Sequence, residues 1–417
     1  MAEHLRDEEH SEVAFVGVPE SLEARLASEA GIEFVGVNAR GWDRSRPMTL
    51  VTATLTAAWS FLRCLLLLRA KRTDVVVGFG GYVSLPLGLA AAFAGVPLVL
   101  HEQNSVPGLV NRFLSRWATT VCVTYAQSIL RLARPGRALV TGDPVRETVL
   151  AGSREAGRVA LGLRKSDLVL LVFGGSRGAR HLNAACVGLF PRLAGIPKLR
   201  VIQVAGPSEI ETAKAALKKA ADGSPHAWWR VHDYIESMGD AIAAADLVVC
   251  RAGATTIAEL SVLGRPSVLV PYPFATDDHQ SFNAAPLMEA GAAAVISDSG
   301  LDSPAFGDEI VRLLTDPARR ASMAAAAAAL AQPYAAHAVA ETAIAAGAVH
   351  SPWRIKERRA ARIDAPHEPD PPTVPGRLPG HVTEAPAETT PAEPEAVAAP
   401  ATDHVAETAA TEEGANA

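Results

Sequence analysis

Short apolar runs alternate with stretches of helical periodicity along the first 350 residues of the chain. A run such as Leu168–Phe173 has the length and the β-branched content of a buried strand, whereas Thr255–Leu263 repeats apolar residues at helical spacing. Strands that alternate with helices in this way predict parallel sheets with helices on both faces. The expected strands fall into two series: Val13–Val18, Phe34–Val37, Val75–Gly78, Pro97–His101, Thr120–Val123 and Leu139–Thr141, followed by Leu168–Phe173, Val201–Ala205, Trp228–Val231, Leu247–Cys250, Ser267–Val270 and Ala294–Ile296.

The two series predict two doubly wound, Rossmann-like α/β domains. We expect an N-terminal domain at residues 1–141, a linker at 142–166 that lacks a strand pattern, and a C-terminal domain at 167–335. A helix rich in alanine, at about 318–348, would close the body, and its closing segment is placed at 336–350. Residues 351–417 are rich in Pro, Ala, Glu and Thr, a composition that cannot bury a core and predicts a disordered tail.

The distribution of charge and the spacing of the cysteines limit the classes of function that this chain can have. The segment 364–417 holds 11 Asp and Glu against one Arg, so the remaining 363 residues carry a net charge of only +4. Such a weak basic excess, without a nucleic-acid-binding motif, excludes nucleic acid as a partner. The four cysteines are scattered without CxxC spacing, which favours neither a disulfide framework nor a zinc site and fits a reducing cytoplasm. The charged first residues lack the apolar core of a signal peptide.

One apolar stretch, residues 50–68, approaches the length of a membrane span. Arg63 interrupts it, which makes a transmembrane helix the least favoured interpretation. It could be a buried amphipathic helix, or a helix that lies on an anionic membrane surface with Trp59 and Phe61 inserted and nearby basic residues at the headgroups. A basic cluster at 354–362 is either a solvated charge run or a second membrane or partner contact.

Candidate chemistry follows the strands of the C-terminal series. Gly174–Asn183 is a glycine turn before a helix, suited to an anion, and Asp246–Leu260 repeats that arrangement with Thr255 and Thr256 as helix-cap candidates. Glu259 could accept hydrogen bonds from a ribose diol. Pro271–Ala284 holds Asp, His, Gln and Asn side chains that suit sugar hydroxyls. Metal binding is disfavoured because the ligand spacing is wrong and no Asp-x-Asp occurs; no cofactor is expected.

The N-terminal series ends in similar loops: Gly78–Ala91, His101–Arg112 and Thr141–Arg146. Because open parallel sheets bind ligands at the carboxyl ends of their strands, polar loops in both domains predict one interdomain cleft.

In this order and spacing, GGYVS, HEQN, TGDPVR, GGSRGA, RAGATTIAEL and DDHQSFNA resemble the MurG family of N-acetylglucosaminyltransferases, glycosyltransferase family 28, over about residues 13–350. The resemblance implies a GT-B fold and an inverting transfer of N-acetylglucosamine (GlcNAc) from UDP-GlcNAc. The acceptor would be the 4-hydroxyl of N-acetylmuramic acid (MurNAc) in undecaprenyl-linked lipid I, giving lipid II for peptidoglycan synthesis. The enzyme would sit peripherally on the anionic cytoplasmic face of the cell membrane.

The resemblance also implies roles for individual residues. Ser176 would contact the diphosphate, Ile235 would pack near uracil, and Glu259 would bind the ribose. His279 and Gln280 would bind the sugar. Helix N-termini would take the place of a divalent cation. The nucleotide would be lined by Ala254, Thr255, Thr256, Ile257 and Ala258, while Asn104 and Arg146 would reach the donor from the N-terminal domain and the linker.

The chain departs from the family pattern at Arg177, where Gln is usual, and at Asp143, where Asn is usual. The family's opening strand, GGTGGH loop and helix do not precede Glu12–Gly17, and that loop carries the family's leading candidate for the catalytic base. The base is therefore unassigned, with His101 and Glu102 as candidates. Either the start lies further upstream or the copy is degenerate. The alternative functions are a UDP-GlcNAc 2-epimerase-like enzyme and, if Met1 is the true start, a catalytically inactive donor-binding protein at the membrane.

Overall fold

The computed structural model describes residues 1–38, 48–174 and 179–355, with side chains from residue 56 onward in the second range. All the described residues belong to one compact unit. All strands of the two expected series are present within a residue or two of their predicted bounds. The disordered tail was predicted to begin at residue 351, which is too early: Ser351 is buried and Arg354 pairs with Asp74 at 3.2 Å. From residue 356 onward the predicted tail lies outside the described residues.

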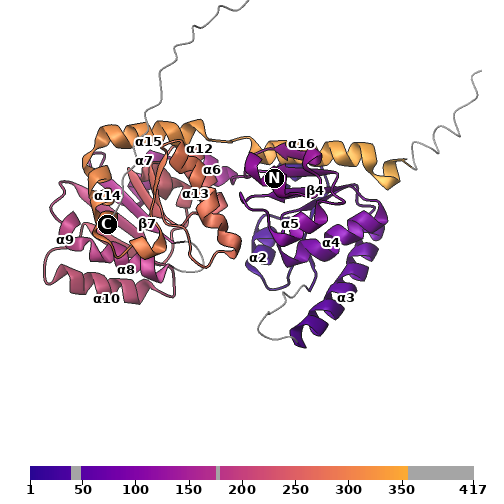
Figure 1. The fold of residues 1–417 in the computed structure, drawn as a ribbon, viewed down its shortest axis with the longest axis horizontal. Coiled ribbons are helices and arrows are strands. Elements are labelled where there is room, and N and C mark those ends of the chain that lie inside the picture. Colours follow the sequence, from indigo (N-terminus) through magenta and orange to yellow (C-terminus); the bar gives the residue numbers. More distant parts are fainter. Residues whose placement is uncertain (39–47, 175–178, 356–417) are drawn as a thin grey trace, which may run out of the picture. The chain divides into compact units, whose positions relative to one another are not determined.

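The C-terminal half is built on a six-stranded parallel sheet in the order β12-β11-β10-β7-β8-β9 (Figure 1). Alternate residues of β7 face opposite sides: Leu170 and Val172 join one hydrophobic cluster, while Val169 and Leu171 join the other. Such two-sided burial explains why these strands read as continuous apolar runs. The strands are β7 (Leu168–Phe173), β8 (Leu199–Val204), β9 (Trp229–His232), β10 (Leu247–Cys250), β11 (Ser267–Leu269) and β12 (Ala293–Val295).

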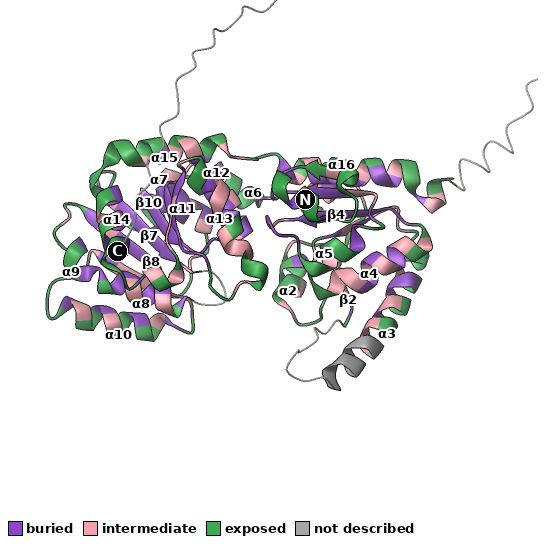
Figure 2. Cartoon of the chain, in the orientation of Figure 1, coloured by how far each residue is buried: buried purple, intermediate pink, exposed green. Residues whose placement is uncertain are grey.

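Helices cover both faces of this sheet. One cluster takes side chains from α8 (Arg180–Gly188), α9 (Phe190–Leu193), α10 (Ile210–Ala221) and α14 (Pro304–Thr315). The other takes them from α11 (Met238–Ala244), α12 (Ala254–Val262), α13 (His279–Glu289) and α15 (Pro317–Ala329). Figure 2 shows the strands buried between these helices. The doubly wound prediction for this half is confirmed.

The N-terminal half contains a four-stranded parallel sheet, β3-β4-β5-β6, and a separate parallel pair, β1-β2. Among the described residues, β1 and β3 each have a ladder partner on one side only. A short helix, α1 (Ala2–Asp7), precedes β1; six residues are too few to show periodicity in the sequence. The strands are β1 (Ala14–Gly17), β2 (Glu33–Gly36), β3 (Val76–Gly78), β4 (Leu98–Glu102), β5 (Thr120–Val123) and β6 (Ala138–Val140), and α2 (Leu22–Glu29) lies between β1 and β2.

The apolar stretch forms a 23-residue helix, α3 (Met48–Ala70), which packs along α4 (Gly81–Ala94). Its described residues divide between two faces. Cys64, Leu65 and Leu68 are buried in the N-terminal core, whereas Trp59 and Leu66 are 68% and 66% exposed. None of the helices in the described ranges is both long and apolar enough to cross a bilayer.

The alanine-rich segment was predicted as one helix at about 318–348, and this prediction is wrong. The structure breaks it into α15, which packs on α12 and α14, and α16 (Ala335–His350), which packs on β4 and β5. Pro333 lies in the break, where it has no N–H to donate and disfavours a helical conformation of Gln332. After completing the C-terminal sheet, the chain therefore returns to the N-terminal half as α16.

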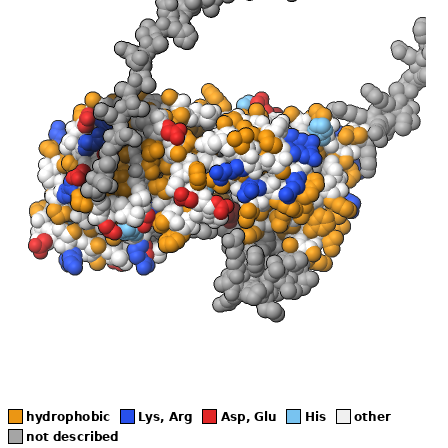
Figure 3. Space-filling model, in the orientation of Figure 1, with side chains coloured by type: hydrophobic (Ala, Val, Ile, Leu, Met, Phe, Trp, Pro, Cys, Tyr) orange, Lys and Arg blue, Asp and Glu red, His pale blue; other side chains and the backbone are white. Residues whose placement is uncertain are grey.

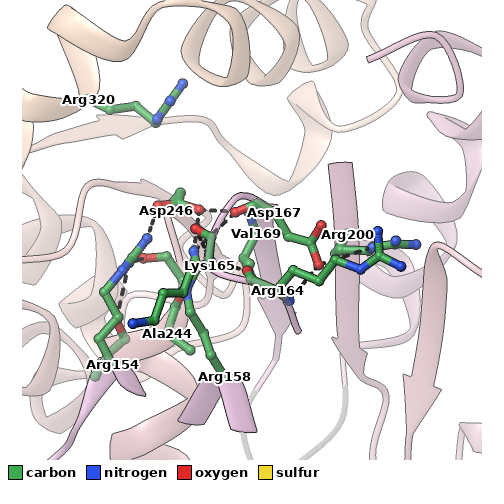
Figure 4. A network of polar contacts seen from close by, with 12 residues as sticks. Arg154, Arg158, Arg164, Lys165, Asp167, Val169, Arg200, Ala244, Asp246 and Arg320 are labelled. Carbon is green, nitrogen blue, oxygen red and sulfur yellow. Dashed lines mark hydrogen bonds and ion pairs between the residues drawn. The ribbon is translucent and has the colours of Figure 1, made fainter. Parts of the chain in front are cut away.

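A polar network attaches the linker helix α7 (Arg154–Ala160) to the C-terminal sheet (Figure 4). The buried Arg158 donates to the carboxylate of Asp246 at 3.0 Å and to the carbonyls of Arg164 and Asp167 at 2.7 and 3.1 Å. Asp246 in turn accepts from the backbone N–H of Val169 at 2.8 Å. The network thus joins α7 to the starts of β7 and β10, at the sheet edge opposite the predicted ligand loops.

Candidate active site

The carboxyl ends of β7, β10 and β11 lie side by side in the C-terminal sheet, as parallel pairing requires. Their loops begin at Gly174, Arg251 and Val270. This edge therefore brings together the three polar segments singled out in the sequence. Ser176, the residue expected at the diphosphate, and Arg177 lie outside the described residues.

Helix α12 opens toward this edge without a side-chain cap. Its N-cap is Gly253 in an extended conformation (φ −67°, ψ 142°), which has no side chain to accept from the backbone N–H groups of the first turn. The prediction that Thr255 or Thr256 caps this helix is therefore wrong, because both lie inside the first turn. Backbone N–H groups of a first turn have no intrahelical acceptor, so Ala254 and the two threonines present donors suited to an anion.

Glu259 lies further along α12 and is only 8% exposed. Burial raises the pKa of its carboxyl, and the nearby Arg146 opposes that shift. The guanidinium of Arg146, at the start of the short linker helix α6 (Glu147–Leu150), stands 3.7 Å from a carboxylate oxygen of Glu259. The Arg146 side chain is 68% exposed. The structure thus brings a linker cation and a buried carboxylate together beside the open end of α12.

The remaining candidates for binding the nucleotide lie in α12 or pack against the same hydrophobic cluster as α12. Ala254 and Ile257 are buried, Thr255 is exposed, and Thr256 and Ala258 are half-buried. Ile235 is half-buried against the same hydrophobic cluster as Ile257.

The loop after β11 holds His279 and Gln280 at the start of α13. Asp277 and Asp278 both adopt left-handed backbone conformations, with φ of 53° and 52°. The Gln280 side-chain oxygen accepts from the N–H of Tyr272 at 2.9 Å, and His279 Nδ1 donates to the Thr276 carbonyl at 2.7 Å. The two side chains are thereby tied to their own loop, and none of the hydrogen bonds among the described residues engages the second ring nitrogen of His279.

Three charged side chains, Arg251, Asp298 and His181, form a brace that connects the loops at this edge of the sheet. Arg251 donates to the carbonyl of Pro271 at 3.2 Å and pairs with Asp298 at 2.6 Å. Asp298 also contacts His181 Nδ1, at the start of α8, at 2.7 Å. Hydrogen bonds to Asp298 and Asp302 raise the pKa of His181. The brace links the loops after β10, β11 and β12 to the helix that follows the glycine turn.

The two candidates for the catalytic base, His101 and Glu102, are each 1% exposed. His101 Nε2 donates to the carbonyl of Gly142 at 2.9 Å, and burial lowers the pKa of the ring to about 4. Glu102 accepts from the N–H groups of Asn104 and Gly108 at 2.9 and 3.0 Å and from the Asn111 side chain at 2.8 Å. Both side chains hold backbone in place instead of facing an open site.

Asn104 connects the N-terminal loop to α13. Its side-chain oxygen accepts from Nδ2 of Asn283 at 3.1 Å, while the N–H of Ser105 donates to Asn283 Oδ1 at 2.8 Å. Asn283 is fully buried. The loop after β4 is therefore joined to the C-terminal half by two hydrogen bonds to one side chain.

Some residues of this site were not among the predicted site residues. Asn283 and Arg251 stand in motifs that the sequence made conspicuous, but their roles depend on partners far away in the chain. Asp143 stands where the family usually has Asn. It is 7% exposed and lines a cavity of about 170 Å³ with Tyr125 and Ile257.

Family models match both halves of the chain. The N-terminal domain of glycosyltransferase family 28 matches residues 1–123, and the C-terminal domain of that family matches residues 169–339. The chain belongs to glycosyltransferase family 28.

Curated relatives narrow the family. The chain is 40% identical over 326 residues to a protein of Desulfitobacterium hafniense named UDP-N-acetylglucosamine–N-acetylmuramyl-(pentapeptide) pyrophosphoryl-undecaprenol N-acetylglucosamine transferase, covering 78% of this chain and 88% of that relative. A protein of the same name from Halothermothrix orenii is 37% identical over 338 residues, with 80% and 91% covered. These relatives confirm the family 28 resemblance found in the motifs.

Solved structures agree. The structure of MurG from Acinetobacter baumannii matches with a TM-score of 0.65 and 29% identity, over 82% of this chain and 93% of that one. A UDP-GlcNAc 2-epimerase from Neisseria meningitidis matches with a TM-score of 0.60 but only 12% identity, over 82% and 94%. The second likeness shows the shared fold alone, so the family 28 assignment is favoured over the epimerase alternative. The predicted GT-B architecture is confirmed.

Proposed function

We propose that this family 28 enzyme transfers GlcNAc from UDP-GlcNAc to the MurNAc 4-hydroxyl of undecaprenyl-linked lipid I, with inversion, to form lipid II. The observation that carries the proposal is the grouping of the uncapped start of α12, the buried Glu259 and Arg146 at one sheet edge. It offers separate sites for an anionic diphosphate and for a ribose diol. The names of the relatives supply the sugar and the lipid-linked acceptor.

The reaction would proceed by attack of the acceptor hydroxyl oxygen on the anomeric carbon while the bond to the UDP oxygen breaks, so that lipid II, UDP and the released hydroxyl proton are the products. Negative charge then accumulates on the leaving diphosphate. We propose that the first-turn N–H groups of α12 and the guanidinium of Arg146 stabilise that charge. His279 and Gln280 would hold the sugar between them and the 271–278 loop.

We propose that His101 and Glu102 act as positioning residues, which hold backbone groups near the site. Glu102 fixes the N–H groups of Asn104 and Gly108, and His101 fixes the carbonyl of Gly142. They would fix the positions of the loop after β4 and of the linker. That loop contacts the C-terminal half through Asn283, and the linker contacts Glu259 through Arg146.

Activity is expected to survive EDTA. Among the described residues no group of three or more His, Cys, Asp or Glu side chains could hold a metal ion. Helix N–H groups and Arg146 are proposed to take the role of a cation. Transfer measured before and after chelation, with added Mg²⁺ as the control, tests this; a complete loss that Mg²⁺ restores would contradict it.

A direct assay would follow radiolabelled GlcNAc from UDP-GlcNAc into purified lipid I. Labelled lipid II is the expected product. Release of a free epimerised sugar without lipid I would support the epimerase alternative. Donor binding without any transfer would support the inactive donor-binding alternative.

We further propose that α3 contacts the anionic cytoplasmic surface of the membrane, where the acceptor lies. Trp59, Leu62 and Leu66 follow one face of α3 and are 68%, 51% and 66% exposed. Phe93, on the adjoining α4, is 71% exposed. Figure 3 shows hydrophobic side chains interspersed with Lys and Arg over the part of the chain that holds α4 and α5 (Leu109–Leu114). Exposed apolar groups beside basic ones are typical of a membrane-surface helix.

Replacing Trp59, Leu62 and Leu66 together by serine is expected to weaken binding to phosphatidylglycerol vesicles at least tenfold, or roughly 1.4 kcal/mol. Binding of UDP-GlcNAc should be unchanged, because none of the three lies at the donor edge. Leu65 and Leu68 are unsuitable for this test, since both are buried and their replacement would damage the core.

Vesicle co-sedimentation and donor calorimetry measure the two properties. Val159→Ser, on α7, is the control, because Val159 is 76% exposed yet far along the chain from α3. Equal vesicle binding by the triple variant and the control would contradict the proposed surface and direct attention to the basic cluster at 354–362.

A further inference from the structure

The linker carboxyl of Asp143 lies in a small cavity beside the proposed donor site. The side chain is 7% exposed, and its Oδ2 atom has no hydrogen-bond partner. Its carboxyl accepts a hydrogen bond from the side chain of Thr255, in the first turn of α12. A buried carboxylate with an unpaired oxygen costs much more free energy than a neutral carboxylic acid in the same place.

The groups around Asp143 do not neutralise a charge on it. Glu102 from β4 and Glu259 from α12 both repel a negative charge there. Tyr125, after β5, is half-buried and lines the same cavity, and His101 is held neutral by its burial. Arg146 stands at Glu259 and is mostly exposed.

The remaining walls of the cavity bring no charge. They come from Thr124, after β5, and from α12, α13 and the α15–α16 connection. An ionised Asp143 would therefore be repelled by two carboxylates, those of Glu259 and Glu102.

The first turn of α12 can serve only one anion at a time. Its N–H groups and dipole favour a negative charge, and an ionised Asp143 bonded to Thr255 would occupy that field. A donor diphosphate approaching the same turn would then meet a fixed carboxylate. A protonated Asp143 keeps the Thr255 hydrogen bond but leaves the helix end to the ligand.

We propose that Asp143 is a titrating positioning residue that couples donor binding to pH, with the neutral carboxyl permitting the diphosphate to bind and the ionised carboxyl opposing it. The inference rests on the proposed function for the identity of the donor. The titration range is physiological, because burial, together with repulsion from Glu259 and Glu102, raises the pKa of Asp143 to about 7 against the hydrogen bond from Thr255.

Calorimetric titration with UDP-GlcNAc at pH 6 to 8.5 tests the coupling on the full chain. This ligand carries a diphosphate diester that does not titrate in the range. Affinity of the wild type is expected to fall by up to about thirtyfold from pH 6 to pH 8.5, as linkage to one proton of a group with a pKa of about 7 predicts. Asp143→Asn, which cannot ionise, should bind with little pH dependence. Asp308→Asn, which removes a carboxyl that is 67% exposed on α14, should behave as the wild type.

Urea unfolding supplies a measurement that needs no ligand. The folded pKa of Asp143 lies above its unfolded value, so the folded state holds a proton that the unfolded state releases as pH rises. The urea midpoint of the wild type should therefore fall relative to that of Asp143→Asn between pH 5 and pH 7, then level off.

The possible results of the two measurements test different parts of the proposal. Parallel urea midpoints for wild type and Asp143→Asn would overturn the titration of Asp143. Diverging midpoints with the same binding profile in both proteins would overturn its coupling to the donor. Diverging midpoints with no donor binding at any pH would instead overturn the proposed function, and the donor part of the inference with it.

Discussion

Replacing Asp246 by alanine is expected to lower the free energy of unfolding by about 3 kcal/mol, because the change leaves a buried cation without its carboxylate. Arg158 is 6% exposed and donates to Asp246 at 3.0 Å. Burial already lowers the pKa of Arg158, and Asp246 is one of the groups that oppose this shift. The backbone N–H of Val169 would also lose its acceptor.

Urea unfolding of the variant measures this effect. Arg154→Ala is the matched control, because Arg154 pairs with the same carboxylate from a side chain that is 40% exposed. It should cost about 1 kcal/mol or less, as exposed ion pairs do. Similar losses for the two variants would show that Arg158 does not depend on Asp246, and that neutral carbonyls suffice to hold it.

Glu259→Ala is expected to weaken UDP-GlcNAc binding by about 1.5–3 kcal/mol, since it removes charge-assisted hydrogen bonds to the ribose. Folding should suffer little, because the partner that it leaves, Arg146, has a side chain that is 68% exposed. Calorimetry with UDP-GlcNAc and with UDP gives the two affinities, which should fall together.

The design must separate a direct contact from an effect through Arg146. Arg146→Ala and the double variant complete a cycle. If Glu259 only orients Arg146, the double variant will bind no worse than Arg146→Ala alone. Glu211→Ala removes a carboxylate that is 84% exposed on α10 and serves as the control. Unchanged affinity in Glu259→Ala would contradict the ribose assignment.

Strands were the most predictable part of this fold. Parallel strands buried on both faces are continuous apolar runs, and β7 shows why, since successive residues enter different hydrophobic clusters. Helix ends were less predictable. Thr255 and Thr256 have the chemistry of caps, yet Gly253 is the N-cap and the helix begins at Ala254, before both threonines. One proline, Pro333, divides a segment whose alanine content alone favours a single helix.

The site was predictable as a set of motifs but not as a set of contacts. A sequence shows that His101 and Glu102 end a strand in a polar loop, but not that both are buried and bonded to backbone. The hydrogen bonds of Asn283 to residues 104 and 105 join positions almost 180 residues apart. Such contacts depend on the tertiary arrangement, and local patterns carry no record of them.

The return of α16 to the N-terminal sheet has a consequence for how the protein is made. Val339 and Ala346 of α16 bury Val99 of β4 and Cys122 of β5. These strand residues are synthesised more than 200 residues before the helix that covers them. On the ribosome the C-terminal sheet, whose strands and helices run from Leu168 to Ala329, can therefore complete its core first. The half of the molecule that is translated first must wait, with one sheet face open to chaperones or to aggregation, until residue 350 has emerged.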